Sequence, residues 1–257
     1  MMNQWIKIIM MAGCVLGYAV SSLLVFPLYP VSIQRYRWIN SRLISFYSSC
    51  VLRIIGCRVT LSGKLDPLLS NMMIVSNHLS YLDILILSSI FPACYVTSQE
   101  VKETIGLGHL TRLAGCLFVE RRSRNNLGRE TDDIRQALGA GLNVVIFPEG
   151  TSTNGDSVLR FRQPLFQAAI DAKKPVLPVT LNYVSMNREP VTRLNRDRLF
   201  WYGDMTFLDH FLGLGQVGSI DVRLRISEAL PGTIPQACPD LSVKAHDRVV
   251  QGFVPVS

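Results

Sequence analysis

Two short polar segments contain the residues best suited to chemistry. The first, SNHLSYLD, places His78 five residues before Asp83. A carboxylate that holds one imidazole nitrogen leaves the other nitrogen free to act as a general base. The second segment, PEGTSTNG, contains Glu149, Gly150 and Thr151. These residue types indicate a site that moves a proton and binds a polar substrate.

The same segments also have a structural interpretation. Ser80 and Asp83 fit the Ser-x-x-acid pattern of a capping box, which predicts a helix over residues 80–90 with Ser80 as its N-cap. Asn77 could hold a turn. Gly150 could supply a positive φ where a strand meets a loop. Each explanation accounts for one residue, whereas a shared site accounts for all of them.

A third cluster, GCLFVERR, ends in Arg121 and Arg122. Adjacent arginines are often surface charges, but guanidinium groups can also clamp a phosphate through a rigid fork of donors. A general base beside a phosphate clamp suits acylation of a hydroxyl on a phosphorylated lipid. The net charge of +7 agrees with an anionic partner, and no nucleic-acid motif is present.

The sequence argues against several other chemistries. No GxSxG elbow is present, and Cys94 and Cys116 lie in apolar runs without a nearby base, so a protein nucleophile is not predicted. No GxGxxG or P-loop motif is present, which argues against hydride transfer and nucleotide-fuelled reactions. The six cysteines and four histidines are dispersed without metal-ligand spacing. We therefore expect neither a metal nor a cofactor.

The N-terminal region is predicted to associate with a membrane. Residues 8–29 carry no charge and are long enough to span a bilayer as one helix, which Pro27 and Pro30 would end. A cleaved signal peptide is one alternative, and a segment that dips into the bilayer and returns is another. Residues 34–56 predict a basic amphipathic helix with Trp and Tyr, typical of a membrane surface or of packing on the main domain. We predict that residues 1–57 anchor the protein, with the main domain on the cytoplasmic side of a bacterial inner membrane.

Residues 58–257 predict an α/β domain with a largely parallel, mixed sheet flanked by helices. The predicted strands are RVTLSG, MMIVS, CYVTS, CLFVE, NVVIF, PVLPVTLNY and SIDVRLRIS, and the predicted helices cover residues 80–90, 102–114, 127–139 and 164–172. The two polar segments follow MMIV and NVVIF. Because ligands gather beyond the carboxyl ends of strands in open α/β sheets, we expect His78 and Glu149 on the same edge.

Four ordered motifs between residues 72 and 181 resemble those of the 1-acyl-sn-glycerol-3-phosphate (lysophosphatidic acid) acyltransferases and the wider glycerolipid acyltransferase family. The NHxxxxD motif matches Asn77, His78 and Asp83. The remaining motifs match Gly115, Phe118 and Arg121, then Phe147 to Thr151, and then Val176 to Val179. FRQPLF, at residues 161–166, is similar to the segment that follows the third motif in that family.

This resemblance implies the glycerolipid acyltransferase fold and direct transfer of an acyl chain from a thioester to a lysolipid hydroxyl, without an acyl-enzyme. His78 would be the base and Asp83 its orienting partner. The residues expected to bind the acceptor are Asn77, Arg121, Arg122, Glu149, Gly150 and Thr151. Acyl-CoA or acyl carrier protein would be the donor, and both are acidic, in agreement with the positive charge of this chain.

The acceptor is less certain from sequence than the reaction, because the third motif has no arginine after Thr151. The segments WYGDM and LDHF resemble a bacterial branch that includes lyso-ornithine lipid acyltransferases, whose acceptors carry no phosphate. The sequence favours lysophosphatidic acid, with Arg122, Arg160 or Arg162 replacing the missing arginine, and another lysolipid such as lyso-ornithine lipid is the alternative. A lipid ester hydrolase and a non-catalytic lipid-binding protein are two further alternatives. The histidine–aspartate pair argues against the second of these.

Overall fold

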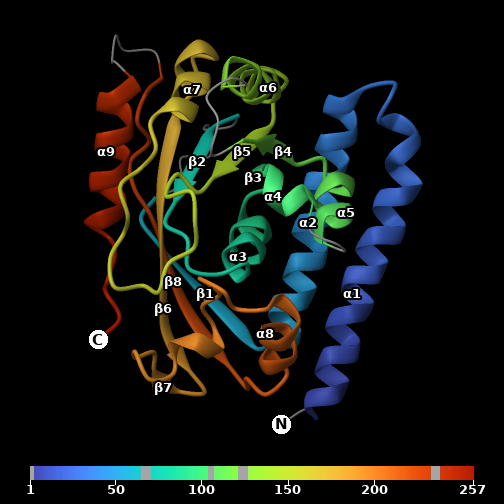
Figure 1. Cartoon of the computed structure of the whole chain (residues 1–257), viewed down its shortest axis with the longest axis vertical. Coiled ribbons are helices and arrows are strands. Elements are labelled where there is room, and N and C mark those ends of the chain that lie inside the picture. The colour runs from blue at the N-terminus through green and yellow to red at the C-terminus, as the bar shows by residue number, and fades with distance from the viewer. Residues whose placement is uncertain (1–2, 65–70, 104–106, 121–126, 233–237) are drawn as a thin grey trace.

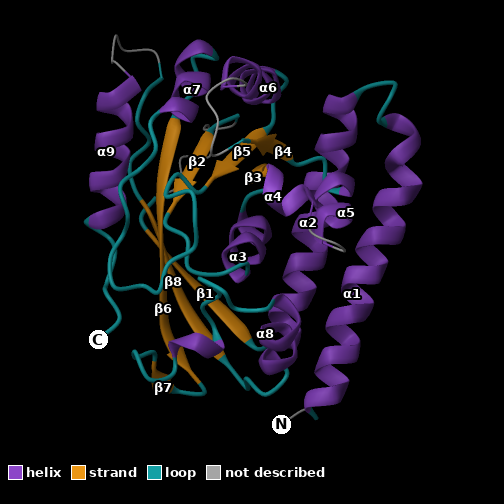
Figure 2. Cartoon of the chain, in the orientation of Figure 1, coloured by secondary structure: helices purple, strands orange, loops and turns teal. Residues whose placement is uncertain are grey.

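The computed structural model describes residues 3–64, 71–103, 107–120, 127–232 and 238–257. Within these ranges, an eight-stranded sheet runs through the centre of the molecule in the order β1-β8-β6-β2-β5-β3-β4, and β7 pairs with β6 (Figures 1 and 2). The strands are β1 (Cys57–Ser62), β2 (Met73–Ser76), β3 (Ala93–Ser98), β4 (Leu117–Val119), β5 (Asn143–Ile146), β6 (Val176–Met186), β7 (Glu189–Pro190) and β8 (Ile220–Ile226). The prediction of a largely parallel, mixed sheet is confirmed, because β8 and β7 run antiparallel to β6 and the other pairs are parallel.

Burial explains why the strands have different sequence patterns. Strand β2 lies between β5 and β6, and all four of its residues are buried. A strand covered on both faces is continuously apolar, as Met73 to Val75 are. Strand β8 instead alternates between buried residues such as Val222 and exposed ones such as Arg223, because one of its faces lies open to solvent.

Helices cover both faces of the sheet (Figure 1). One core contains residues of α2 (Ile33–Ile54) and α3 (Leu82–Ile90), and the other contains residues of α6 (Leu127–Gly139), α7 (Gln167–Asp171) and α9 (Cys238–Val250). Ile74 enters the first core, whereas Met73 and Val75 enter the second. Burying one such side chain contributes roughly 1.5–3 kcal/mol, so a slip of β2 by one residue would be costly on both faces. The register that positions His78 is therefore strongly specified.

The N-terminal helices α1 (Gln4–Val25) and α2 form a hairpin along one side of the domain (Figures 1 and 2). A short 3-10 turn, Phe26–Leu28, ends α1 at Pro27 as predicted. Helix α2 packs on the domain, where the Tyr36 hydroxyl donates to the carbonyl of Leu113 at 2.5 Å and Arg37 Nε donates to the carbonyl of Gly115 at 3.0 Å. Among the described residues, one helical stretch, Gln4–Leu28, is long and apolar enough to cross a membrane, and only 11% of its most apolar window is buried.

Helix α1 is attached to the rest of the chain near both of its ends. At its start, Lys7 Nζ donates to the carbonyl of Val217 at 2.6 Å. Near its end, the Ser22 hydroxyl donates to the side-chain amide oxygen of Asn40 in α2. Helix α1 therefore runs beside α2, and its start also contacts the segment that precedes β8 (Figure 1).

The seven predicted strands are all present, and the structure corrects several helix boundaries. Where one helix was predicted over residues 102–114, the described residues form α4 (Gln99–Glu103), which begins three residues earlier, and α5 (Leu107–Leu113). Residues 164–172 begin with the 3-10 turn Pro164–Phe166 before α7. Helices α8 (Phe207–Leu214) and α9, the 3-10 turn Arg196–Arg198 and strand β7 were not predicted.

Candidate active site

The carboxyl ends of two neighbouring strands bring the main candidate residues together. Strands β2 and β5 are parallel, with Ile74 opposite Val145, so the segments that follow them leave the same edge of the sheet. The backbone N–H of His78, after β2, donates to Glu149 Oε1, after β5, at 2.7 Å. The ring of Phe147 stacks on the imidazole with centroids 4.0 Å apart. The expected common edge is therefore present.

His78 and Asp83 form a hydrogen-bonded pair. His78 Nδ1 lies 2.9 Å from Asp83 Oδ2, and the Asp83 side chain is fully buried whereas that of His78 is 16% exposed. The backbone N–H groups of Leu79 and Ser80 also donate to Oδ2, at 2.6 and 2.9 Å. A carboxylate held in this way accepts a hydrogen bond from the protonated Nδ1 of His78. The lone pair of Nε2 then points away from Asp83. The pair is arranged to work as a general base.

The prediction that Ser80 is the N-cap of a helix over residues 80–90 is wrong. Helix α3 begins at Leu82 with Tyr81 at the N-cap position and no side-chain cap. The Ser80 hydroxyl accepts a hydrogen bond from the N–H of Leu82 at 3.3 Å. Asp83 does reach back to the N–H of Ser80, as the acid of a capping box does. The same carboxylate therefore serves both the helix start and His78.

Asn77 fixes the backbone of the loop in front of His78. Its side-chain nitrogen donates to the carbonyl of Leu181 at 3.0 Å, and its side-chain oxygen accepts from the N–H of Leu181 at 2.8 Å. Leu181 lies in the central part of β6, and Asn77 is buried. This pairing of an amide with a strand backbone positions the loop, and it turns the Asn77 side chain towards the sheet.

The Glu149 carboxylate joins three segments around the site. Oε1 accepts from His78, and Oε2 accepts from the N–H of Leu159 at 2.7 Å. Glu149 is 4% exposed. Burial raises its pKa to about 7, with a smaller upward effect from Asp83, and the two backbone donors act in the opposite direction. Both carboxylate oxygens are engaged with backbone, so the structure gives Glu149 a bracing position within the site.

The loop after Glu149 is held by several long-range contacts. Gly150 has φ 77°, and an added Cβ there would lie 2.7 Å from the guanidinium of Arg162. Thr151 is exposed, whereas the N–H of Thr153 donates to the carbonyl of His78 at 2.9 Å. Further along, the N–H of Val256 donates to the carbonyl of Gly155 at 3.0 Å. The C-terminal segment thus braces the loop.

A pocket of about 480 Å³ opens beside Phe147 and Gly150. It lies beyond the ends of β3, β4 and β5. Its charged lining residues are Glu120, Glu130, Arg160 and Arg162. Glu130 Oε1 accepts from the N–H of Glu120 at 2.6 Å, and burial raises the pKa of Glu130. Arg121 and Arg122 lie outside the described residues, so their predicted role stays a prediction.

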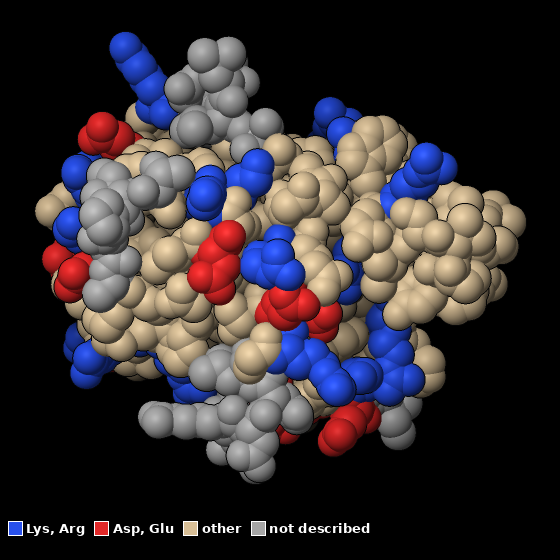
Figure 3. Space-filling model, turned by 90° about the horizontal axis from the view of Figure 1, so that it is seen from above, with Lys and Arg blue, Asp and Glu red and all other residues tan. Residues whose placement is uncertain are grey.

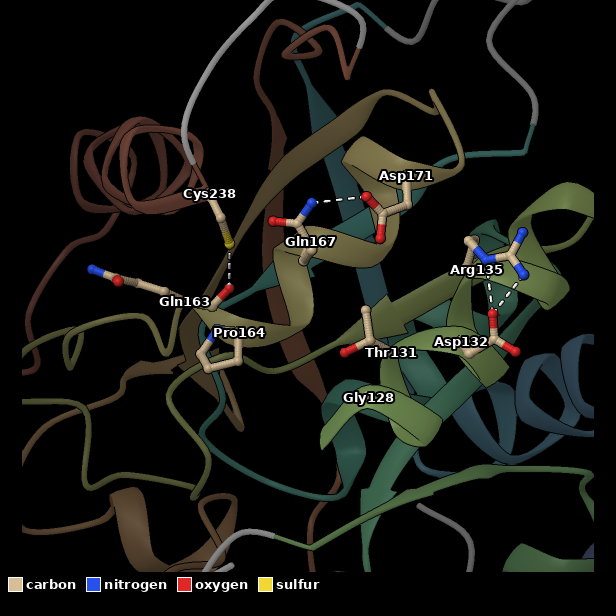
Figure 4. Close-up of a pocket in the computed structure, with 9 residues that line it drawn as sticks. All are labelled: Gly128, Thr131, Asp132, Arg135, Gln163, Pro164, Gln167, Asp171 and Cys238. Atoms are coloured by element: carbon tan, nitrogen blue, oxygen red, sulfur yellow. Dashed lines mark hydrogen bonds and ion pairs between the residues drawn. The ribbon is translucent and has the colours of Figure 1, made fainter. Parts of the chain in front are cut away.

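A second pocket of about 530 Å³ lies next to the first, and both are lined by Gln163 and Pro164. Figure 4 shows it between α6 and α7, with Cys238 Sγ donating to the carbonyl of Gln163 at 2.9 Å. Seen from above, the molecule shows basic and acidic side chains side by side across the middle of this face (Figure 3). The pockets are therefore lined and surrounded by charges of both signs.

Sequence reasoning did not identify Tyr183 as part of the site. Its hydroxyl donates to Asp83 Oδ1 at 2.7 Å, and the residue is 7% exposed. The signal was present in the alternation of the strand PVLPVTLNY, which places Tyr183 on the same face of β6 as Leu181. No group of three or more His, Cys, Asp or Glu side chains that could hold a metal occurs in the part of the chain that the structure describes.

Comparison with known proteins agrees with this site. The family model for "Acyltransferase" matches residues 58–182. The chain is 35% identical over 192 residues to a lyso-ornithine lipid O-acyltransferase of Rhizobium meliloti, a match that covers 71% of this chain and 64% of that protein. It is 36% identical over 114 residues to the 1-acyl-sn-glycerol-3-phosphate acyltransferase of Neisseria gonorrhoeae, covering 44% of this chain and 45% of that protein.

The fold also matches a solved structure. The crystal structure of the 1-acyl-sn-glycerophosphate acyltransferase from Thermotoga maritima superimposes with a TM-score of 0.61 over 95% of this chain and 96% of that chain, at 17% sequence identity. That similarity concerns the fold. The chain is also 34% identical over 197 residues to a lyso-ornithine lipid O-acyltransferase of Brucella abortus, a match that covers 72% of that protein. Together with the matching family model, this similarity shows that the chain belongs to the acyltransferase family, as its motifs predicted.

Proposed function

We propose that this protein transfers an acyl chain from an acyl thioester to the free hydroxyl of a lysolipid. The observation that carries the proposal is the pairing of His78 Nδ1 with a fully buried Asp83, on a loop fixed by Asn77. That arrangement leaves Nε2 of the half-buried imidazole as the available base. A binding protein would need no such pair.

In the proposed reaction, Nε2 of His78 accepts the proton of the acceptor hydroxyl as its oxygen attacks the thioester carbonyl. A C–O bond forms, and the C–S bond breaks as the tetrahedral intermediate collapses. The imidazolium then returns its proton to the leaving thiolate. Asp83 keeps Nδ1 protonated and stabilises the transient positive charge. No side chain of the protein is acylated.

The pocket beside Phe147 and Gly150, called the inner pocket below, is lined by charges of both signs, which favours an acceptor with a zwitterionic headgroup. An ornithine headgroup carries a carboxylate, which suits Arg160 and Arg162, and an ammonium, which suits Glu120 and Glu130. The relative named for lyso-ornithine lipid also matches 71% of this chain. We therefore put lyso-ornithine lipid first as the acceptor.

Lysophosphatidic acid, which the sequence favours, is the second candidate. The two arginines of the inner pocket, Arg160 and Arg162, could bind its phosphate. The relative named for this activity is as similar over a shorter stretch. The donor is proposed to be acyl-CoA or acyl carrier protein, whose negative charge suits a chain of net charge +7.

The protein associates with a membrane through its N-terminal hairpin, residues 1–57, on which the α/β domain of residues 58–257 sits. Exposed apolar residues on α1 include Ile9, Leu16 and Leu24. The α1–α2 turn is apolar as well, and Figure 3 shows the right-hand edge of the molecule, where this turn lies, largely without charge. Because Lys7 attaches the start of α1 to the carbonyl of Val217 in the domain, and Ser22 attaches its end to Asn40 of α2, we propose that α1 lies within one leaflet. The domain then faces the cytoplasm at the inner membrane.

The first experiment is an acyl-transfer assay on detergent-purified protein, with lyso-ornithine lipid, lysophosphatidic acid and other lysolipids as acceptors, and with acyl-CoA or acyl carrier protein as donor. We expect diacyl product in the parent and none in His78→Ala, while His109→Ala, an exposed histidine in α5, keeps full activity. Product from lysophosphatidic acid alone would reverse the order of the two acceptors. Acyl release without acceptor would support a hydrolase instead.

The leaflet proposal is tested by an epitope tag placed before residue 1 in membrane vesicles of known orientation. We expect protease to remove the tag from the same side on which it reaches the α/β domain. Cleavage from the opposite side would show that α1 crosses the bilayer, and it would contradict the Lys7–Val217 contact.

A further inference from the structure

Tyr183 holds the oxygen of Asp83 that faces away from His78. The hydroxyl of Tyr183 lies 2.7 Å from Oδ1, while Oδ2 accepts from His78, Leu79 and Ser80. Tyr183 stands in β6, and its ring packs edge-on against Phe200 with centroids 5.3 Å apart. Asp83 is thus held by hydrogen bonds from two segments that are distant in sequence, the loop after β2 and strand β6.

The direction of this hydrogen bond follows from the protonation of Tyr183. Burial, reinforced by the neighbouring Asp83 carboxylate, holds the pKa of Tyr183 well above its usual range. The hydroxyl therefore keeps its proton at neutral pH and donates it to Oδ1. A hydrogen bond to a charged group of this kind is stronger than one between neutral groups.

Rotation of the Asp83 carboxylate about its last torsion moves both oxygens, and the hydrogen bond from Tyr183 opposes that rotation at Oδ1 in addition to the three donors at Oδ2. We propose that Tyr183 is a positioning residue for acyl transfer, which acts through Asp83 to fix the ring of His78 and to moderate its basicity. The role rests on the proposed function, because it concerns the proton that the acceptor hydroxyl must lose. It gives β6 a part in the reaction that the four sequence motifs do not include.

The effect on basicity has a defined sign. A donor at Oδ1 draws charge from Oδ2, so Asp83 attracts the Nδ1 proton less strongly than it would alone. Removing the hydroxyl strengthens that attraction and favours the imidazolium. Titratable or charged groups near the pair include Cys57 on β1 and Tyr81, whose hydroxyl is hydrogen-bonded to His210 Nδ1. Glu149 and, beside Gly150, Arg162 lie on the loop after β5. All of them stay in place in a Tyr183→Phe variant.

The test is Tyr183→Phe, with Tyr95→Phe as the matched control. Tyr95 is also buried in the first core, but its hydroxyl bonds to Ser88 and to the carbonyl of Ile84 within α3. We expect kcat of Tyr183→Phe to fall ~10-fold or more with KM unchanged, because the looser orientation of Asp83 and of the His78 ring outweighs the gain in basicity. The pH midpoint at which kcat rises should move upward in Tyr183→Phe and stay in place in Tyr95→Phe.

A second readout does not depend on turnover. In ¹⁵N-histidine-labelled protein, the imidazole signals of His78, assigned by their loss in His78→Ala, should titrate with a higher midpoint in Tyr183→Phe than in the parent. An unmoved or lower midpoint in folded Tyr183→Phe would overturn the proposal, as would equal losses of kcat in both Phe variants. If the parent lacked acyltransferase activity, the proposed function would fail while this titration still measured the Tyr183 effect.

Discussion

Glu149→Gln tests how burial of the Glu149 carboxyl affects the stability of the protein. The carboxyl has an ordinary pKa of 4.5 and a folded-state pKa of about 7, chiefly because it is buried. Between these pH values the unfolded chain loses the proton while the folded protein keeps it, so stability falls as pH rises. At about 1.4 kcal/mol for each pH unit, the loss amounts to roughly 3 kcal/mol by pH 8. Below pH 4.5 both states are protonated, and the loss disappears.

The measurement is thermal unfolding of parent and Glu149→Gln in the same detergent, from pH 4.5 to pH 8. Glutamine keeps the shape of the side chain but cannot ionise. The melting temperature of Glu149→Gln should therefore fall less with rising pH than that of the parent. For a chain of this length, about 3 kcal/mol corresponds to roughly 10 °C in the difference between the two curves. Parallel curves for the two proteins would refute the assignment of this titration to Glu149.

Three further substitutions probe other parts of the site. Asp83→Asn should lower kcat by at least ~100-fold in the transfer assay, and near-parental activity in a folded variant would contradict the general-base role. Asn77→Ala leaves a buried N–H and a carbonyl of β6 unpaired and should cost about 2–4 kcal/mol in chemical unfolding, whereas an unchanged midpoint would show that water replaces the amide. Gly150→Ala forces the Arg162 guanidinium to move and should raise KM for the acceptor. Gly203→Ala is the control, with φ 60° and no neighbour within 4 Å of the added Cβ, and equal KM effects in both would remove the link to Arg162.

Much of the fold could be predicted because its strands are short, apolar and separated by clear helical patterns. Burial on both faces makes β2 and β5 continuous apolar runs, and that pattern also placed His78 and Glu149 at a common edge. Helices α8 and α9 were missed for a physical reason. Helix α8 is eight residues long. Helix α9 is rich in polar residues, and one of its buried residues is Ser242, so its apolar pattern is interrupted. Each has only a short start signal in the sequence, Thr206-x-x-Asp209 before α8 and Pro239 with Asp240 in the first turn of α9.

Within the site, residue types were predictable but hydrogen-bond partners were not. His78 and Asp83 are close in sequence, so a local pattern reveals them. Tyr183 approaches Asp83 from β6, one hundred residues later, and only the packing of that strand shows the contact. Glu149 could equally have faced a ligand, and its bonds to two backbone N–H groups depend on how its loop folds back.

The hydrogen bond between Val256 and Gly155 has a consequence for biosynthesis. The loop that contains Glu149 leaves the ribosome well before Val256 is made. That loop cannot acquire its final brace until Val256 has emerged. The loop next to His78 therefore lacks this contact for the whole time that residues 156–255 are being synthesised.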